Sequence, residues 1–90
     1  SVSLGYLDNA PVARITRGGN TAADVMVFCG FAESEEGELT DVEVATVYQP
    51  DSGLYVAEGL SSPATANKVV RFRMVLPDGQ EPWIGHIAAP

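Results

Sequence analysis

Apolar and polar residues alternate with a period of two along much of this chain, and this alternation is the strongest constraint on its fold. In the segment 68–76, every second residue from position 70 onward is apolar, and two arginines lie between the apolar positions. Successive side chains of a β-strand point to opposite faces of a sheet, so this spacing predicts a strand with one face in the core. The expected inward residues are Val70, Phe72, Met74 and Leu76, and the expected outward residues are Arg71 and Arg73.

Two other segments alternate in the same way but differ in their second face. In 24–31 both faces are apolar, which predicts a central strand covered on both faces. In 40–48 one face is apolar and the other carries acidic residues, as is typical of a half-buried strand. The first segment places Val25, Val27, Cys29 and Phe31 opposite Met26 and Phe28; the second places Val42, Val44, Thr46 and Tyr48 opposite Asp41, Glu43, Ala45 and Val47.

Turn-forming residues separate these segments from four shorter expected strands at 2–7, 12–17, 54–57 and 83–87. Such residues reverse the chain because they adopt turn backbone angles readily. No helix of ordinary length is expected, since the best candidate, 33–38, contains Gly37 and has no apolar stripe. The turns are expected at Asn9-Ala10-Pro11, Gly18-Gly19-Asn20, Gln49-Pro50-Asp51-Ser52-Gly53 and Pro77-Asp78-Gly79.

About seven short strands with turns between them predict one all-β domain over residues 1–90, a β-sandwich of antiparallel strands. A small, partly open β-barrel is the alternative. The segments 24–32, 41–49 and 68–87, with the Pro77-Asp78-Gly79 turn and Trp83, make the chain resemble immunoglobulin-like or fibronectin-III-like modules. That resemblance implies a sandwich used for display, spacing or binding, with no specific ligand. The cysteine pair of antibody domains is missing, because Cys29 is the only cysteine.

The charge balance excludes several classes of function. Twelve acidic residues against five Lys and Arg give a formal net charge of −7, which argues against binding nucleic acid through phosphate contacts. A single cysteine forms no internal disulfide, and one cysteine with one histidine does not suit a structural zinc site. No apolar stretch approaches the ~20 residues that a membrane-spanning helix needs. We therefore expect no cofactor, no metal, no membrane insertion and no small-molecule ligand.

Half of the acidic residues are concentrated in one short segment, 33–43. We interpret it first as a solvated hairpin loop whose charges resist edge-to-edge aggregation. The alternatives are a contact patch for a basic partner and a calcium site, since Ca²⁺ prefers clustered oxygen ligands. The six residues are Glu33, Glu35, Glu36, Glu38, Asp41 and Glu43.

Three other residues are candidates for contact with a partner. Arg71 and Arg73 are expected to pair across strands with Glu43 and its neighbours; alternatively they form a basic spot that meets an acidic surface on another copy. Trp83 is expected to anchor a core or an interface, with stacking on a sugar ring as the alternative. The candidate interaction surface is thus Glu33, Glu35, Glu36, Glu38, Asp41, Arg71, Arg73 and Trp83.

No residue set predicts catalysis. Cys29 lies on an apolar face, where a thiol ionises poorly, and a dyad with His86, the only histidine, is not expected. The overall expectation is a non-enzymatic structural or interaction module within a larger assembly, such as a virion, where it binds copies of itself or other proteins and decorates a capsid. The alternative is an immunoglobulin-like accessory or adhesion module of a secreted or surface protein that binds carbohydrate or calcium.

Overall fold

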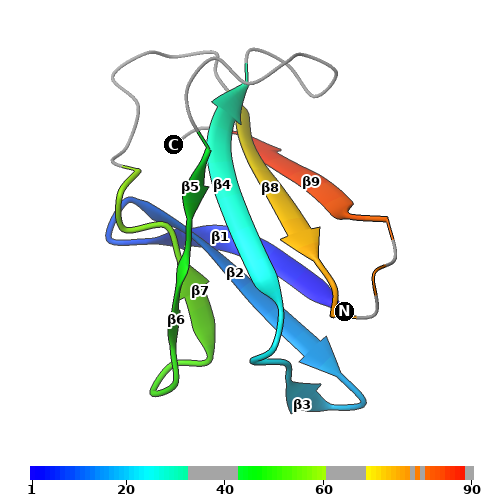
Figure 1. The fold of residues 1–90 in the computed structure, drawn as a ribbon. Coiled ribbons are helices and arrows are strands. Elements are labelled where there is room, and N and C mark those ends of the chain that lie inside the picture. The colour runs from blue at the N-terminus through cyan, green and yellow to red at the C-terminus, as the bar shows by residue number, and fades with distance from the viewer. Residues whose placement is uncertain (33–42, 61–68, 78, 80, 89–90) are drawn as a thin grey trace.

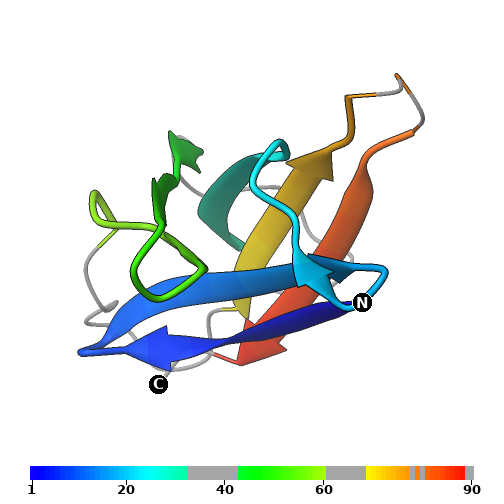
Figure 2. The same ribbon diagram turned by 90° about the horizontal axis from the view of Figure 1, so that it is seen from below.

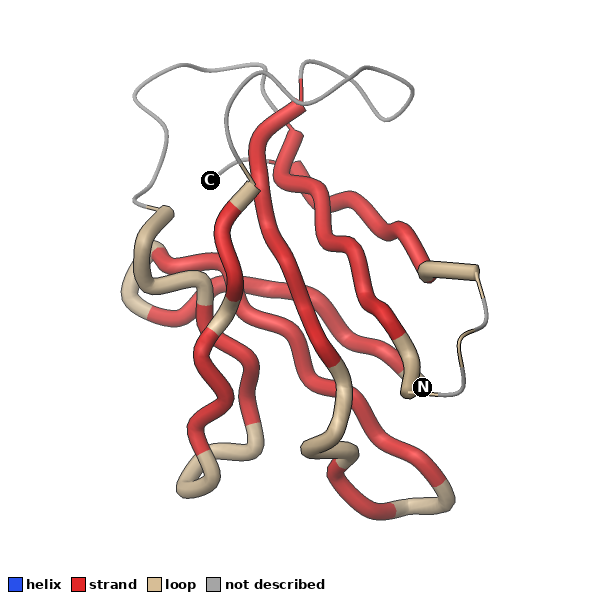
Figure 3. Tube along the Cα trace, viewed as in Figure 1, coloured by secondary structure: helices blue, strands red, loops and turns tan. Residues whose placement is uncertain are grey.

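The computed structural model describes residues 1–32, 43–60, 69–77, 79 and 81–88. Nine β-strands and no helix lie in this part of the chain (Figures 1 and 3). No helix there has the length and apolar character needed to cross a membrane. The strands are β1 (Val2–Leu7), β2 (Ala10–Arg17), β3 (Asn20–Thr21), β4 (Met26–Ala32), β5 (Val44–Ala45), β6 (Val47–Gln49), β7 (Leu54–Val56), β8 (Val69–Val75) and β9 (Trp83–Ala88).

The strands form two antiparallel sheets packed face to face, which confirms the predicted two-layer all-β architecture (Figure 2). One sheet has the order β1-β2-β7-β6, with β3 paired to β2. The other has the order β5-β4-β8-β9. We call the side of this second sheet that faces away from the first sheet its outer face.

The predicted strand at 40–48 is divided between the two sheets, and its first three residues lie outside the described part of the chain. β5 pairs with β4 in one sheet, and β6 pairs with β7 in the other. Thr46 lies at the crossover, where its backbone nitrogen and its Oγ1 both donate to the Val27 carbonyl at 2.9 Å. The prediction of one continuous strand was therefore wrong.

The first turn lies slightly earlier than predicted. Leu7 pairs with Ala10, so Asp8 and Asn9 form the reversal, with positive φ of 50° and 67°. Two consecutive positive φ angles suit the right-handed twist of a hairpin, and Asn and Asp tolerate them. Pro11 lies inside β2, and its carbonyl accepts a hydrogen bond from Ala57.

The core consists of the inward residues of both sheets. In β8, Val70, Phe72 and Met74 are at most 2% exposed, so the predicted alternation of this strand is confirmed. In the first sheet, Ala13 and Tyr55 are among the buried residues. No buried charged or polar residue occurs in the described part of the chain.

The prediction that β4 is covered on both faces was wrong at its first residue, Met26. Val27, Cys29 and Phe31 are buried, but Met26, on the opposite face, is 60% exposed. The described strands make only two layers, and none of them covers the Met26 end of this face. The outer face of β4 is thus exposed at Met26, whereas Phe28 is half-buried and Gly30 and Ala32 are buried.

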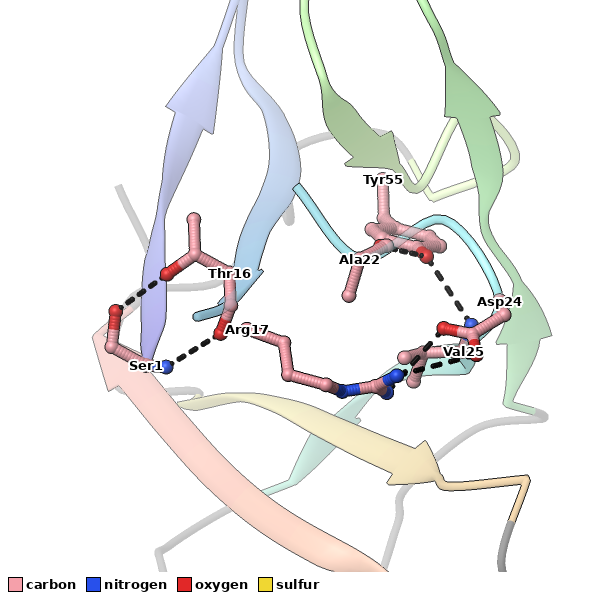
Figure 4. Close-up of polar contacts among 7 residues, drawn as sticks. All are labelled: Ser1, Thr16, Arg17, Ala22, Asp24, Val25 and Tyr55. Atoms are coloured by element: carbon pink, nitrogen blue, oxygen red, sulfur yellow. Dashed lines mark hydrogen bonds and ion pairs between the residues drawn. The ribbon is translucent and has the colours of Figure 1, made fainter. Parts of the chain in front are cut away.

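Polar contacts tie the connections to the sheets (Figure 4). The buried Tyr55 hydroxyl donates to the Ala22 carbonyl at 2.6 Å and accepts from the Val25 nitrogen at 3.4 Å, which holds the chain between β3 and β4. Elsewhere, the Tyr6 hydroxyl donates to the Ala88 carbonyl at 2.5 Å and so links the edge strands β1 and β9.

Candidate interaction surface

An ion pair organises the outer face of the second sheet. The Arg73 side chain of β8 donates from Nη2 to Glu43 Oε1 at 2.7 Å and from Nε to both carboxylate oxygens at 3.1 Å. The two side chains are 30% and 16% exposed. These hydrogen bonds raise the pKa of the Arg73 guanidinium above its ordinary value. The predicted pairing of Arg73 with Glu43 is confirmed, and it uses the charge of Arg73 within the molecule.

The same guanidinium covers an aromatic ring. The Arg73 Cζ atom lies 4.4 Å from the centroid of the Phe28 ring, as in a cation–π contact. Phe28 and Arg73 are opposite each other in the β4–β8 register, so their side chains share the outer face. One arginine therefore neutralises Glu43 and shields part of the apolar face of β4.

Farther along β4, that shielding ends. Met26 is 60% exposed, and it lies on the rim of a crevice of about 230 Å³ between the strands (the Met26 crevice). Tyr48 and Tyr55 also line this crevice, with ring centroids 4.9 Å apart and a tilt of 50°. Other lining residues are Phe28, Ala45 and Thr46. The buried Val25 and Val27 line it too, so the crevice is mostly apolar and lies where β4 meets the β5–β6 crossover and β7.

The predicted site set did not include the residues of the Met26 crevice. The signal was present, because Met26 and Phe28 form a second apolar face in 24–31. That face was interpreted as covered by another layer of the same domain. The crossover at Thr46, which brings Ala45 and Tyr48 beside β4, has no counterpart in the hydrophobic pattern.

Arg71 and His86 lie on the outer face as well. They are opposite each other in the β8–β9 register, and both are half-buried. On the other side, Arg71 pairs with Gly30, which has no side chain. The two residues thus form a short polar row beside the Arg73–Glu43 pair.

Trp83 begins β9, on the inward side of the edge strand. It is opposite Met74 in the register and is 40% exposed, so it is not a core residue of the described fold. Its ring lies over Gly85 of the same strand. Tyr48 and Tyr55 lie at the Met26 crevice, and Tyr6 contacts the other end of β9 at Ala88.

Cys29 is a core residue, as predicted. It is fully buried on the inward face of β4, and burial, followed by the negative charge of Glu43, raises the pKa of its thiol from 9.0 to about 12. His86 lies on the outer face, on the other side of the same sheet. A neutral, enclosed thiol of this kind is not a nucleophile at neutral pH.

Five of the predicted contact residues fall outside the described part of the chain: Glu33, Glu35, Glu36, Glu38 and Asp41. Among the residues that are described, no three His, Cys, Asp or Glu side chains are grouped as a metal ion requires.

Comparison with known proteins gives no match to a family model, to a curated protein or to a solved structure.

Proposed function

We propose that this protein is a non-enzymatic interaction module that works within a larger assembly, such as a virion, by presenting the outer face of β4 to a protein partner. The observation that carries the proposal is the exposed apolar end of that face at Met26. Met26 is 60% exposed at the rim of an apolar crevice, although the other side of the same strand is buried. Apolar surface that a fold leaves exposed around a concave site is typical of protein interaction sites.

A partner that inserts an apolar side chain into the Met26 crevice would cover Met26 and the rings of Phe28 and Tyr48. Complete burial of one methionine side chain contributes about 1.5–3 kcal/mol, and the exposed part of Met26 accounts for roughly 1–2 kcal/mol of that. Such a contact is weak alone. Many copies in one assembly make it strong through multivalency.

We propose further that the fold is of the immunoglobulin type. The strand orders β1-β2-β7-β6 and β5-β4-β8-β9 correspond to the ABED sheet and the C′CFG sheet of such domains. Modules of this type carry their function on exposed surfaces and loops over a rigid sandwich. Because a fold alone does not determine function, the binding role rests on the exposed apolar surface at Met26.

The test is incorporation into the assembly. Particles from the natural source, separated by density-gradient sedimentation, are expected to contain the wild-type protein and to lose it, by at least about tenfold, on Met26→Glu. The matched control is Val47→Glu, because Val47 is 48% exposed but does not line the crevice. Absence of the wild-type protein from every fast-sedimenting fraction would overturn the proposal, as would equal incorporation of both variants.

A further inference from the structure

We propose that β9 pairs with β9 of a second copy of this chain to form a two-fold symmetric dimer. In this dimer the β5-β4-β8-β9 sheets of the two molecules join into one continuous eight-stranded sheet. This pairing uses the strand edge and not the Met26 crevice. It is therefore independent of the partner proposed above, and either can fail alone.

The hydrogen-bonding direction of β9 follows from the crossover at Thr46. Thr46 N donates to the Val27 carbonyl at 2.9 Å, so Val27 directs its backbone toward β5 and the next residue directs its backbone toward β8. This direction alternates along each strand of an antiparallel sheet. Phe28 therefore bonds Arg73, its partner in β8, and the neighbours of Arg73, with every second residue beyond them, direct their backbone groups toward β9. The partners of these β8 residues are Trp83, Gly85 and Ile87, which therefore bond to β8. The backbone groups of Ile84, His86 and Ala88 lie on the free edge.

A second contact agrees with this assignment. The Ala88 carbonyl accepts its hydrogen bond from Tyr6 of β1, which lies on the side away from β8. In Figure 2 the C-terminal end of β9 lies beside β1, and its N-terminal end lies well away from β1. No described residue bonds to the outward backbone groups of Ile84 and His86.

The edge of β9 also lacks the features that normally prevent strand pairing. Natural sheets protect their edges with charges, proline, bulges or short strands. β9 contains no Lys, Arg, Asp, Glu or Pro, and its six residues pair one-to-one with β8 without a bulge. By contrast, the edge strands β5 and β6 have only two and three residues.

One register makes the edge self-complementary. With Gly85 on the two-fold axis, Ile84 of each copy is opposite His86 of the other, and these two pairs exchange four backbone hydrogen bonds. A shift of the β9–β9 register to the next hydrogen-bonded pair in one direction would place Pro82, which has no N–H, opposite His86. A shift in the other direction would use the Ala88 carbonyl, which Tyr6 already occupies. Pro82 and Ala88 thus mark the ends of the paired segment.

The side chains fit the same register. On the inward face, Trp83 of one copy is opposite Ile87 of the other, so two apolar residues meet. Trp83 and Ile84, which are 40% and 45% exposed in the single molecule, both become covered. Gly85 itself has no side chain, and the Trp83 indole of each copy lies over its own Gly85, so the two indoles lie beside the axis on the inward face.

Sedimentation equilibrium tests the pairing, from about 10 μM to about 1 mM protein, at roughly 1 M salt to screen repulsion between the acidic copies. The wild type is expected to form dimers. His86→Pro removes an outward N–H without removing a bond to β8, so it is expected to weaken the dimer by at least about tenfold. His86→Thr, which keeps the N–H, is the control and is expected to dimerise. A wild type that stays monomeric throughout would overturn the proposal.

Disulfide cross-linking tests the register without relying on the proline variant. Residues opposite each other in a hydrogen-bonded pair lie ~5.5 Å apart at Cα, within disulfide range. A mixture of Ile84→Cys and His86→Cys proteins is expected to form the mixed cross-link far faster than either variant cross-links alone. The buried Cys29 does not compete. Equal rates in the mixture and in the separate variants would contradict this register and with it the proposal.

Discussion

The indole of Trp83 lies directly over Gly85, so that a β-carbon added to Gly85 would fall 2.0 Å from the Trp83 Cη2 atom. The two residues are two positions apart on β9 and therefore share one face of the edge strand. Glycine is needed here because of space, not because of backbone angle. The absence of a side chain at Gly85 leaves the space in which the indole of Trp83, the only tryptophan of the chain, lies.

Gly85→Ala is expected to displace the indole into solvent. Because Trp83 is already 40% exposed and only the far end of its ring must move, the variant should lose about 1 kcal/mol or less of unfolding free energy, and its tryptophan emission should shift to the red. Gly5→Ala is the matched strand control, since nothing lies within 4 Å of a β-carbon at Gly5. An unchanged emission spectrum in Gly85→Ala would contradict the described position of Trp83.

Tyr55→Phe is expected to destabilise the protein by about 1–3 kcal/mol, measured by urea unfolding. The change removes a buried hydroxyl that is bonded to Ala22 and Val25, and it leaves the Ala22 carbonyl without its donor. Tyr48→Phe serves as the control, because no hydrogen bond of the Tyr48 hydroxyl is seen in the described part of the chain. Equal losses for the two variants would show that the Tyr55 hydroxyl does not hold the β3–β4 connection.

The Arg73–Glu43 pair is expected to be worth more than the Arg17–Asp24 pair. The first is 30% and 16% exposed and bonded at 2.7 Å, whereas the second is 59% and 55% exposed at 3.4 Å. Double-mutant cycles with Arg→Met and acid→amide substitutions should give about 1 kcal/mol of coupling for the first pair and about 0.2 kcal/mol for the second. A reversed order would contradict the described geometry of the outer face.

Stability is expected to fall with pH above about 9, in part because of Cys29. The folded thiol has its pKa raised from 9.0 to about 12, so between these values the unfolded chain releases a proton that the folded chain keeps. The contribution is fully present below pH 9.0 and is lost as the pH rises toward 12. Cys29→Ala should therefore flatten the dependence of unfolding free energy on pH in this window, by up to about 1.4 kcal/mol per pH unit. Identical slopes would mean that the thiol is not held neutral by burial.

Much of the fold follows from local alternation, and what it misses is long-range. The strand at β8 and the burial of Cys29 were predicted because one period-two pattern determines both. The division at Thr46 was not predicted, because a strand can change sheets without changing its alternation. The second apolar face of β4 was recognised in the sequence. Whether a further layer covers that face depends on segments far away in the chain, which local alternation does not reveal.

The candidate site was only partly predictable. Arg73 was paired correctly with Glu43, since both project from strands that were identified by their pattern. The Met26 crevice was missed because it forms where β4, the β5–β6 crossover and β7 meet. No sequence spacing relates Met26 to Ala45 and Tyr55.

Methionine oxidation tests whether the exposed outer face of β4 at Met26 binds a partner. The chain has two methionines, of which Met26 is 60% exposed and Met74 is 2% exposed, so Met74 is an internal control. In the isolated protein, dilute peroxide should oxidise Met26 much faster than Met74. In assemblies from the natural source, the oxidation rate of Met26 is expected to fall at least about tenfold, toward that of Met74. A Met26 rate equal to that of the isolated protein would show that no partner covers Met26 in the assembly.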